Sequence, residues 1–437
     1  MSTDERERTS ARESAQGQSV AGLFGPLLRT VLGGAPPVRF EFWDDSAAGP
    51  RDGSDVVKVL SPDALRRMMW SPGELGLGRA YVAGDLDVAG DVFTVLRTLQ
   101  GAASNDAQIG IGAAFSALGV ARRLGALGLP PSPPPEEARP RGRRHSKSRD
   151  ADAISHHYDV GNDFYRLFLG PSLTYSCARF TDEDTSLEDA QAAKHELISR
   201  KLGLDERPGM RLLDIGCGWG SMALHAAARY GAEVVGVTIS EEQAAAARER
   251  VAEAGLSDQV EIRLQDYRDL AGETFDAVSS VGMFEHVGTE RTAEYFTVIR
   301  SLLRPHGRLL NHAISSVGGS VMGSKSFIAR YVFPDGELLD VGEVVLAMER
   351  AGFEVRDVES LREHYARTLR HWVANLEANW DEAVRLVGPA RARIWRLYMA
   401  ASALGFEDGG IAVHQVLGVL PDPAGGSGMP PTRRTWG

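Results

Sequence analysis

Cysteine is scarce in this chain of 437 residues, which contains only Cys177 and Cys217. The two have neither C-x-x-C spacing nor the spacing of metal ligands, which argues against a zinc ribbon, a thioredoxin-like motif and a disulfide scaffold. No run of about 18 uninterrupted apolar residues is present, so we expect no transmembrane helix. The first residues, MSTDERERTSARESAQGQS, lack the apolar core of a signal peptide. These absences predict a protein of a reducing, cytoplasmic compartment.

Basic residues are fewer than acidic ones: the chain has 48 Lys and Arg residues and 59 Asp and Glu residues, which gives a formal net charge of −11. An acidic surface disfavours binding of the whole molecule to nucleic acid, and we expect no nucleic-acid partner. The exception is 139–149, which has no acidic residue and six basic ones: Arg139, Arg141, Arg143, Arg144, Lys147 and Arg149. This stretch is either a plain tether or a contact with anionic lipid headgroups. Binding of nucleic acid is disfavoured because no aromatic side chains interleave the charges.

Changes in composition along the chain predict five segments. They are a disordered N-terminus (1–18), a small N-terminal structural or interaction domain (19–129), a proline-rich and then basic linker (130–149), a larger domain (150–420) and a disordered tail (421–437). In the N-terminal domain the patterns predict strands over 38–43 and 55–60 and a helix over 61–70.

From residue 150 onward, helical and strand patterns alternate. Helices are predicted over 186–203 and 221–230, and strands over 210–215, 233–239, 260–264, 275–281 and 307–314. Such alternation is typical of an α/β fold with a doubly wound parallel sheet, here joined to a smaller N-terminal domain.

A glycine-rich loop lies between the strand over 210–215 and the helix over 221–230. It contains Gly216, Gly218 and Gly220, with Asp214 at the end of the strand. Glycine permits a tight turn and a close approach of a ligand to the backbone. The spacing is not that of a dinucleotide fold, because Ser221 stands where G-x-G-x-x-G needs its third glycine, and no G-K-[ST] follows as in a P-loop. The loop therefore disfavours NAD and a P-loop nucleotide, and a plain strand-to-helix turn stays open as the alternative.

Polar residues also follow the other predicted strands: Thr238, Gln243, Gln265, Asp266 and Glu285. Ligands of open α/β sheets bind at the carboxyl ends of the strands, where these side chains converge. Each one alone is more often a helix cap or a turn former, but the row together suits a nucleoside with an amino-acid tail.

The motifs resemble a known family. LLDIGCGWGSMALHAA looks like the S-adenosylmethionine loop of class I methyltransferases. Four further segments resemble the cyclopropane fatty acyl phospholipid synthases, relatives of the mycolic acid methyltransferases: HHYDVGNDFYRLFLGPSLTYSCARF (156–180), GVTISEEQ (236–243), LQDYRDL (264–270) and SSVGMFEHVG (279–288). The resemblance covers about 150–420 and implies that this region is an S-adenosylmethionine-dependent methyltransferase domain with acyl-binding elements. Far less specifically, the resemblance also implies a lipid-binding N-terminal domain over 19–129. It implies a class I methyltransferase-like fold and transfer of a methyl group to the cis double bond of a phospholipid acyl chain, followed by loss of a proton and ring closure.

The resemblance also implies the site residues. Those expected to bind S-adenosylmethionine are Tyr158, Tyr175, Ser176, Gly216, Gly218, Thr238, Gln243, Gln265 and Asp266, to which the loop adds Asp214 and Gly220. A bound bicarbonate, the base of the family, is expected among Cys177, Glu285, His312 and Tyr365. There Glu285 would accept the bicarbonate hydroxyl hydrogen, His312 and Tyr365 would donate, and Cys177 would contribute its backbone or thiol. No metal is expected, since the family is not metal dependent.

Several outcomes stay open at this stage. The same methyl transfer to an oleoyl chain gives a 10-methylene branch, which a partner reductase converts into a 10-methyl branch. A mycolate-type or small-molecule methyltransferase is a second alternative, and a lipid-binding protein without activity a third. The expected partner is an unsaturated phospholipid at the inner face of the cell membrane, where the chain would be peripherally bound. A homodimer is a further expectation.

Overall fold

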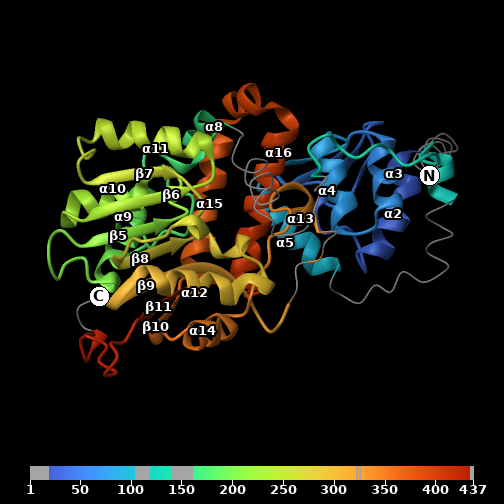
Figure 1. Ribbon diagram of the computed structural model, residues 1–437. Coiled ribbons are helices and arrows are strands. Elements are labelled where there is room, and N and C mark those ends of the chain that lie inside the picture. The colour runs from blue at the N-terminus through green and yellow to red at the C-terminus, as the bar shows by residue number, and fades with distance from the viewer. Residues whose placement is uncertain (1–18, 104–118, 139–160, 321–322, 324–325, 434–437) are drawn as a thin grey trace, which may run out of the picture. The chain divides into compact units, whose positions relative to one another are not determined.

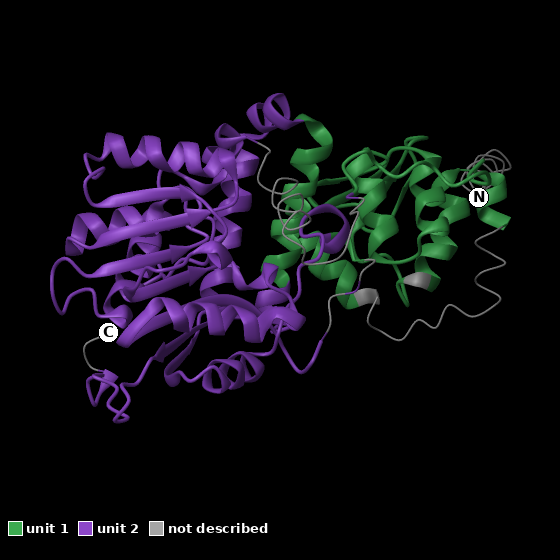
Figure 2. Cartoon of the chain, in the orientation of Figure 1, with its two compact units in different colours: residues 1–137, 325–327, 388–404 green, residues 138–324, 328–387, 405–437 purple. Residues whose placement is uncertain are grey.

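The computed structural model describes residues 19–103, 119–138, 161–320, 323 and 326–433. The predicted N-terminal segment 1–18, the basic stretch 139–149 and Tyr158 lie outside these residues. Contacts divide the chain into two compact units, coloured green and purple in Figure 2. Unit 1 comprises 1–137, 325–327 and 388–404, and unit 2 comprises the remainder. No helix in the described residues is long and apolar enough to cross a membrane.

Unit 1 is built on a four-stranded sheet of order β2-β1-β3-β4. Its elements are α2 (Val20–Val31), β1 (Arg39–Phe42), β2 (Ala47–Ala48), β3 (Val56–Val59), α3 (Pro62–Trp70), α4 (Glu74–Ala83), β4 (Leu86–Ala89) and α5 (Val92–Ala103). Both predicted strands and the predicted helix are present. Helix α3 begins at Pro62 because Ser61 Oγ accepts a hydrogen bond from Asp63 N at 3.1 Å.

The proline-rich half of the expected linker is held against unit 1. Arg67 donates to the carbonyl oxygen of Ser132 at 2.7 Å, and Glu137 is buried in a two-pronged ion pair with Arg79. Residues 130–137 are therefore fixed by long-range contacts, a result that the extended pattern of prolines does not reveal.

Unit 2 contains a seven-stranded sheet of order β10-β11-β9-β8-β5-β6-β7. The strands are β5 (Arg211–Ile215), β6 (Glu233–Thr238), β7 (Val260–Leu264), β8 (Phe275–Val281), β9 (Leu303–Ser316), β10 (Glu354–Ser360) and β11 (Ile411–Val419). The helices between and around them are α8 (Asn162–Leu169), α9 (Leu187–Leu202), α10 (Ser221–Tyr230), α11 (Glu241–Glu253), α12 (Thr292–Leu302), α13 (Phe327–Tyr331), α14 (Val341–Arg350), α15 (Arg362–Ala378) and α16 (Trp380–Glu407).

Helices cover both faces of this sheet, as Figure 1 shows. One core cluster joins side chains of α9, α10 and α11 to one face, and a second joins α12 and α14 to the other. Strands β5 to β9 pair in parallel with one another, whereas β11 runs antiparallel to both β9 and β10. The predicted α/β, class I methyltransferase-like fold is confirmed, with one reversed strand that the sequence pattern does not show.

Two features of the C-terminal part depart from expectation. Helix α16 is interrupted at Gly388, which has a φ of 79° and is followed by Pro389. Residues 388–404 belong to unit 1, although we expected them within the 150–420 domain. The segment expected as a disordered tail has defined turns up to residue 433. Asp422 Oδ1 accepts hydrogen bonds from the backbone N–H groups of Ala424 and Gly426 and so closes a turn.

Candidate active site

The glycine loop forms the floor of a cavity at the carboxyl ends of β5, β6 and β8. Gly216 has a φ of 72°, and a Cβ atom there would lie 3.0 Å from Met283 Cγ, so only glycine fits. Its N–H donates to the carbonyl oxygen of Val237 at 2.9 Å, which ties the loop to β6. Gly220, with a φ of 80°, precedes α10, so the N-terminus of that helix follows the cavity floor.

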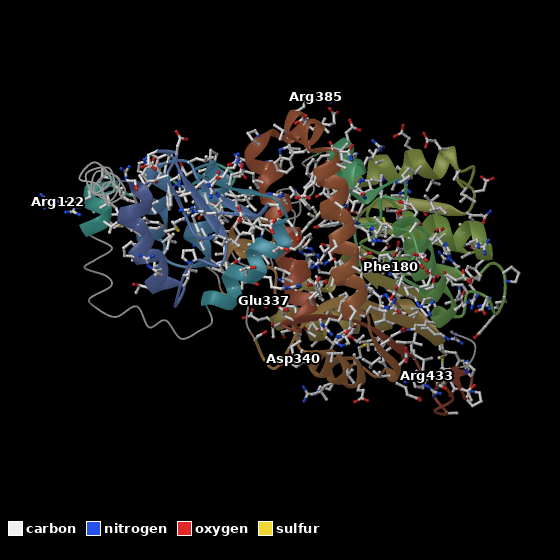
Figure 3. All side chains as sticks on the ribbon, turned by 180° about the vertical axis from the view of Figure 1, so that it is seen from behind. Arg122, Phe180, Glu337, Asp340, Arg385 and Arg433 are labelled. Carbon is white, nitrogen blue, oxygen red and sulfur yellow. The ribbon has the colours of Figure 1, made fainter. Side chains whose placement is uncertain are left out.

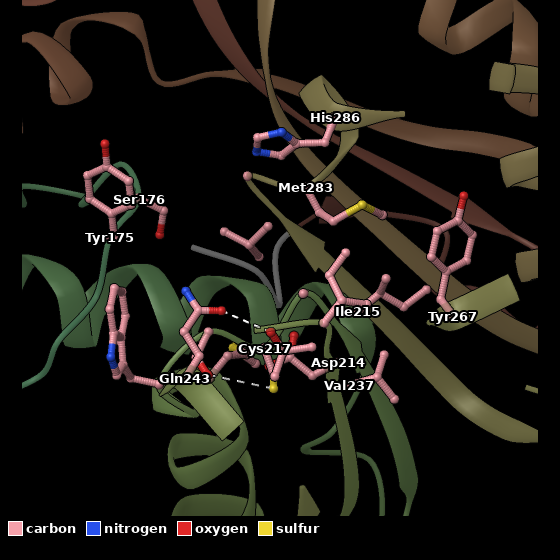
Figure 4. Close-up of a pocket in the computed structure, with 18 of the residues that line it drawn as sticks. Tyr175, Ser176, Asp214, Ile215, Cys217, Val237, Gln243, Tyr267, Met283 and His286 are labelled. Carbon is pink, nitrogen blue, oxygen red and sulfur yellow. Dashed lines mark hydrogen bonds between the residues drawn. The ribbon is translucent and has the colours of Figure 1, made fainter. Parts of the chain in front are cut away.

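Nine of the residues expected to bind the methyl donor line this one cavity. They are Tyr175, Ser176, Asp214, Gly216, Gly218, Thr238, Gln243, Gln265 and Asp266. Figure 4 shows several of them, with Tyr175 and Ser176 on one wall and Met283 and His286 on another. Gly220 shapes the turn and does not line the cavity, and Tyr158 lies outside the described residues. That these side chains contact S-adenosylmethionine stays a prediction.

Most polar side chains of the cavity are held by partners close in the sequence. Thr238 Oγ1 donates to Gln243 Oε1 at 2.9 Å, and Gln265 Nε2 donates to the carbonyl oxygen of Asp269 at 3.2 Å. Asp266 accepts from the side chain and the backbone N–H of Arg268. These short-range bonds fix the side chains before any ligand binds.

Asp214 differs from them, because only one of its oxygens is satisfied. Ser279 Oγ donates to Oδ1 at 2.7 Å, whereas Oδ2 is buried and has no hydrogen-bond partner among the described residues. Burial raises the pKa of this carboxyl group to about 6, although the Ser279 bond opposes the shift. Near pH 7 the group is mostly ionised, and Oδ2 is an acceptor available to a ligand.

Lys194, which was not predicted, also lines the cavity. This side chain is 1% exposed, and its Nζ donates to Ser176 Oγ at 2.9 Å and lies 3.0 Å from His195 Nε2. Burial lowers the pKa of the ammonium group to about 7. A signal was present, because Lys194 occupies the apolar stripe of α9 between Ala190 and Leu197. Trp219, Met283 and His286 line the cavity as well and were not anticipated.

None of the four residues expected to hold bicarbonate lines the cavity, but two lie directly behind its wall. Glu285 stands between the lining residues Met283 and His286, and its Oε1 accepts from Ile314 N at 2.7 Å. The carbonyl oxygen of His312 accepts from Gly282 N at 2.8 Å. Glu285 and His312 thus meet at the same part of β9.

A buried polar group forms around this meeting point, and we name it the base cluster: Glu285, His312 and Gln415. Gln415 is opposite His312 in the β9–β11 pairing, and its Nε2 lies 3.3 Å from His312 Nδ1. Glu285 Oε2, His312 Nε2 and Gln415 Oε1 are buried with no hydrogen-bond partner in the described part of the chain. Gln415 was not predicted, although a polar residue within the apolar run of β11 is itself a signal.

Desolvation governs the charges of the base cluster. It raises the pKa of the Glu285 carboxyl group to about 7, against the lowering effect of the Ile314 hydrogen bond. It lowers the pKa of His312 to about 3, so this imidazole is neutral near pH 7. The cluster therefore presents one carboxyl group poised between its two forms and one neutral imidazole.

Cys177 and Tyr365 meet elsewhere, at the start of α15. The Leu361 carbonyl oxygen lies 3.6 Å from Cys177 Sγ and accepts from Tyr365 N at 3.0 Å. Leu361 N donates to Val413 O of β11, two residues before Gln415, which links this pair to the base cluster. Complete burial raises the pKa of the Cys177 thiol, so it is protonated and not a nucleophile.

The chain is similar to known methyltransferases and cyclopropane synthases. The model of the family "Mycolic acid cyclopropane synthetase" matches residues 145–416. The chain is 45% identical over 409 residues to the probable fatty acid methyltransferase Rv3720 of Mycobacterium tuberculosis, covering 91% of this chain and 94% of that one. It is 34% identical over 392 residues to the tuberculostearic acid methyltransferase UfaA1 of the same organism, covering 87% of each.

Two further similarities cover about three fifths of the chain. The cyclopropane-fatty-acyl-phospholipid synthase of Escherichia coli is 41% identical over 272 residues, or 62% of this chain and 69% of that one. The crystal structure of the mycolic acid cyclopropane synthase CmaA1 complexed with SAH and CTAB aligns with a TM-score of 0.58 at 35% identity, covering 61% of this chain and 97% of that one.

Proposed function

The chain belongs to the mycolic acid cyclopropane synthetase family of S-adenosylmethionine-dependent methyltransferases, and from this premise we propose that it methylates the cis double bond of an unsaturated phospholipid acyl chain and closes a cyclopropane ring. The observation that carries the proposal is the position of the base cluster. Glu285 lies between Met283 and His286, which line the cavity that the glycine loop forms, and the carbonyl oxygen of His312 accepts from the N–H of Gly282, which also lines it. This position supports a proton-removing site beside the cavity that we assign to the methyl donor.

The cavity suits the methyl donor. S-adenosylmethionine, when bound, supplies an electrophilic methyl group on its sulfonium. Asp214 Oδ2 offers a buried acceptor, and the Lys194–Ser176 hydrogen bond holds the wall opposite the glycine loop. The centroids of the Tyr175 and Trp372 rings lie 5.3 Å apart, and the Trp372 side chain is completely buried. An alkene is a weak nucleophile, so a rigid wall that excludes water favours its alignment with the methyl group.

The base cluster suits a small oxyacid such as bicarbonate, which when bound supplies the base that removes the proton. If Gln415 Nε2 donates to His312 Nδ1, the imidazole proton sits on Nε2, and this atom is a buried donor without a partner. Glu285 Oε2 is the matching buried acceptor. One donor and one acceptor match the oxygen and the hydroxyl group of bicarbonate. We propose that Glu285 and His312 hold it, with Cys177 and Tyr365 at its border.

A second candidate function has a specific observation in its favour. Similarity to the fatty acid methyltransferases extends over nearly the whole chain, whereas similarity to the cyclopropane synthase of Escherichia coli covers 62% of it. The second candidate is therefore methyl transfer to an oleoyl chain without ring closure, giving the 10-methylene branch. This version requires a partner reductase to reach the 10-methyl product.

Product analysis tests the proposal. The purified chain is incubated with S-adenosylmethionine and vesicles of dioleoyl phospholipid, and the released fatty acid methyl esters are resolved by gas chromatography and mass spectrometry. Ring and methylene products share one mass, so retention is compared with standards of each. A cyclopropane product is the expected result. A methylene product selects the second candidate, and the absence of an added carbon on any acyl chain contradicts both.

A further inference from the structure

A row of titratable side chains leads from the cavity to the surface of unit 2, and we name it the relay row: Lys194, His195, His225 and Glu196. Lys194 and His195 line the cavity and are buried, at 1% and 5% exposure. The side chains of His225 and Glu196 are 14% and 27% exposed. The row therefore begins in the cavity and ends at solvent.

The inner end of the row lies beside the groups that we assign to the base. Lys194 Nζ lies 3.0 Å from His195 Nε2 and donates to Ser176 Oγ at 2.9 Å. Ser176 directly precedes Cys177, which we place at the border of the base. Helix α9, which carries Lys194, packs against β9, the strand of His312. Desolvation and, in addition, the charge of Lys194 lower the pKa of His312, so the two side chains lie within electrostatic reach of each other.

The outer end of the row is a histidine beside a carboxylate. The ring centroids of His195 and His225 lie 5.6 Å apart, a separation that a direct contact or one water molecule bridges. His225 Nε2 lies 3.4 Å from Glu196 Oε2, an ion-pair contact without hydrogen-bond geometry. Glu196 is held in place because it also accepts from Arg200 at 2.8 Å and bonds to Tyr230.

The inner members of the row are mostly uncharged near pH 7. Within the described residues, Lys194 bonds to a hydroxyl group and an imidazole, and no carboxylate forms an ion pair with it. Burial lowers the pKa of its amine to about 7. Desolvation also lowers the pKa of His195 well below its usual range, and it lowers the pKa of His225 against the opposing charge of Glu196.

The last member of the row is charged. Desolvation raises the pKa of the Glu196 carboxyl group, but the hydrogen bonds of Tyr230 and Arg200 outweigh it, and the net shift is downward. Groups that can take up a proton thus stand in front of an anion at the surface. A purely structural role explains this less well, because a buried amine without a counterion lowers stability.

The proposed reaction needs an exit for protons. The donor supplies a methyl cation and the product keeps only a methylene group, so each turnover releases one proton. That proton leaves a C–H bond, whose electron pair forms the new carbon–carbon bond of the ring or the double bond of the methylene branch. Because the site is closed to water, the proton needs a path through side chains.

We propose that the relay row conducts this proton from the base cluster to solvent. Lys194 Nζ takes up the proton and passes one to His195 Nε2. His195 releases its other ring proton to His225, which hands it to Glu196 and so to bulk water. Each member returns to its starting state, and no further reactant is needed. The proposal rests on the proposed function, and it applies to the ring and the methylene product alike.

Chemical rescue tests the relay. His225→Ala removes an imidazole outside the cavity and is expected to lower turnover on dioleoyl vesicles about tenfold, less than the loss of a base that touches the substrate. Imidazole in the assay buffer should restore most of this loss, because it can occupy the space and carry the proton. The Kd for S-adenosylmethionine in calorimetry should stay unchanged. Unchanged turnover, or a loss that imidazole does not restore, overturns the proposal.

His306→Ala is the matched control, because His306 Nε2 lies 3.0 Å from Asp422 Oδ2 and so forms a similar pair outside the row. Turnover of this variant should equal that of wild type with and without imidazole. If it loses turnover and regains it with imidazole as His225→Ala does, the effect is not specific to the row and the relay is wrong.

Glu196→Gln tests the outer end without any turnover. In the ligand-free chain, the pKa of His225 measured by imidazole NMR should fall, because the charge of Glu196 raises it. The control is Glu382→Gln on α16, which removes the partner of the exposed Arg385 and should leave the pKa of His225 unchanged. Figure 3 shows the position of Arg385. An unchanged pKa of His225 in Glu196→Gln would overturn the exit through this carboxylate.

Two results separate the relay from the proposed function. If wild type adds a carbon to the acyl chain and His225→Ala does so at the same rate, the relay is wrong and the proposed function stands. If wild type adds no carbon to any lipid, the proposed function is wrong and the relay is overturned with it.

Discussion

The cofactor cavity and the base cluster differ in how their polar atoms are satisfied. In the cavity, Thr238 bonds to Gln243 and Gln265 bonds to Asp269, partners within five residues of each other. In the base cluster, Glu285 meets β9 and His312 meets Gln415 across two strands, with three buried atoms left without partners in the described chain. Buried atoms without a partner are exceptions in the cavity, where Asp214 Oδ2 and Thr174 Oγ1 have none among the described residues, whereas each member of the base cluster has one.

This difference affects how each region would bind a ligand. Local bonds preorganise the cavity, so a ligand there displaces water and gains contacts without reordering side chains. A buried polar atom without a partner costs about 1–3 kcal/mol. A group that bonds to these atoms therefore gains affinity, and changes in the cluster should affect turnover more than binding of the methyl donor.

Glu285→Gln should have the largest effect, because it should lower turnover and leave binding of the methyl donor unchanged. The amide keeps the shape but loses the acceptor and proton-holding capacity of Oε2. Turnover should fall by about 10²–10⁴-fold, while the Kd for S-adenosylmethionine in calorimetry changes less than twofold. The control is Glu290→Gln, an exposed carboxylate of the same region, which should leave both values unchanged. Full turnover of Glu285→Gln would contradict the role of the cluster.

Lys194→Met should act on the opposite region. The change leaves Ser176 Oγ and His195 Nε2 without their shared partner, so the cavity wall loses its anchor. We expect the Kd for S-adenosylmethionine to rise about tenfold, which corresponds to about 1.4 kcal/mol.

Lys201→Met is the matched control for Lys194→Met, because Lys201 is equally buried on α9 but pairs with Asp357 and Glu359. It should lower the unfolding midpoint and leave the Kd unchanged. If both variants weaken binding of the methyl donor equally, Lys194 acts only through the stability of the fold.

Gln415→Leu should sharpen the description of the base cluster. Without the amide, His312 Nδ1 has lost its hydrogen-bond donor, and the imidazole can carry its proton on either nitrogen. We expect kcat to fall about fivefold to tenfold at unchanged affinity for the methyl donor. Gln259→Leu, at an exposed position before β7, serves as the control. An unchanged kcat would mean that the tautomer of His312 does not matter.

The pH dependence of stability tests the base cluster through unfolding instead of through turnover. The pKa of Glu285 is raised by desolvation from 4.5 to about 7, so between these values the folded chain holds a proton that the unfolded chain has released. The contribution of this group to stability is therefore largest at low pH and is lost as the pH rises through about 7. Urea unfolding should show wild type losing stability relative to Glu285→Gln between pH 5 and pH 8. A constant difference would contradict the raised pKa.

Much of the fold could be read from local patterns. The predicted strands and helices follow from alternation and helical periodicity, as at Ser186, whose hydroxyl caps α9 by accepting from Asp189 N. Strand β11, which is reversed in the sheet, was not predicted, and its direction depends on how the chain returns after α16 and not on its composition. The turn at Asp422 was missed because glycine and proline dominate the surrounding sequence and suggest disorder.

The sequence by itself determined the fold class and the floor of the cavity, because glycines at fixed spacing and polar residues at strand ends act within a few residues of one another. Only the tertiary structure decided that Lys194 faces the cavity, that Gln415 stands beside His312, and that Trp70 is bonded to the loop carrying Leu129. These contacts join segments distant in the chain. Their energies come from burial and from hydrogen bonds across elements, which no local pattern records.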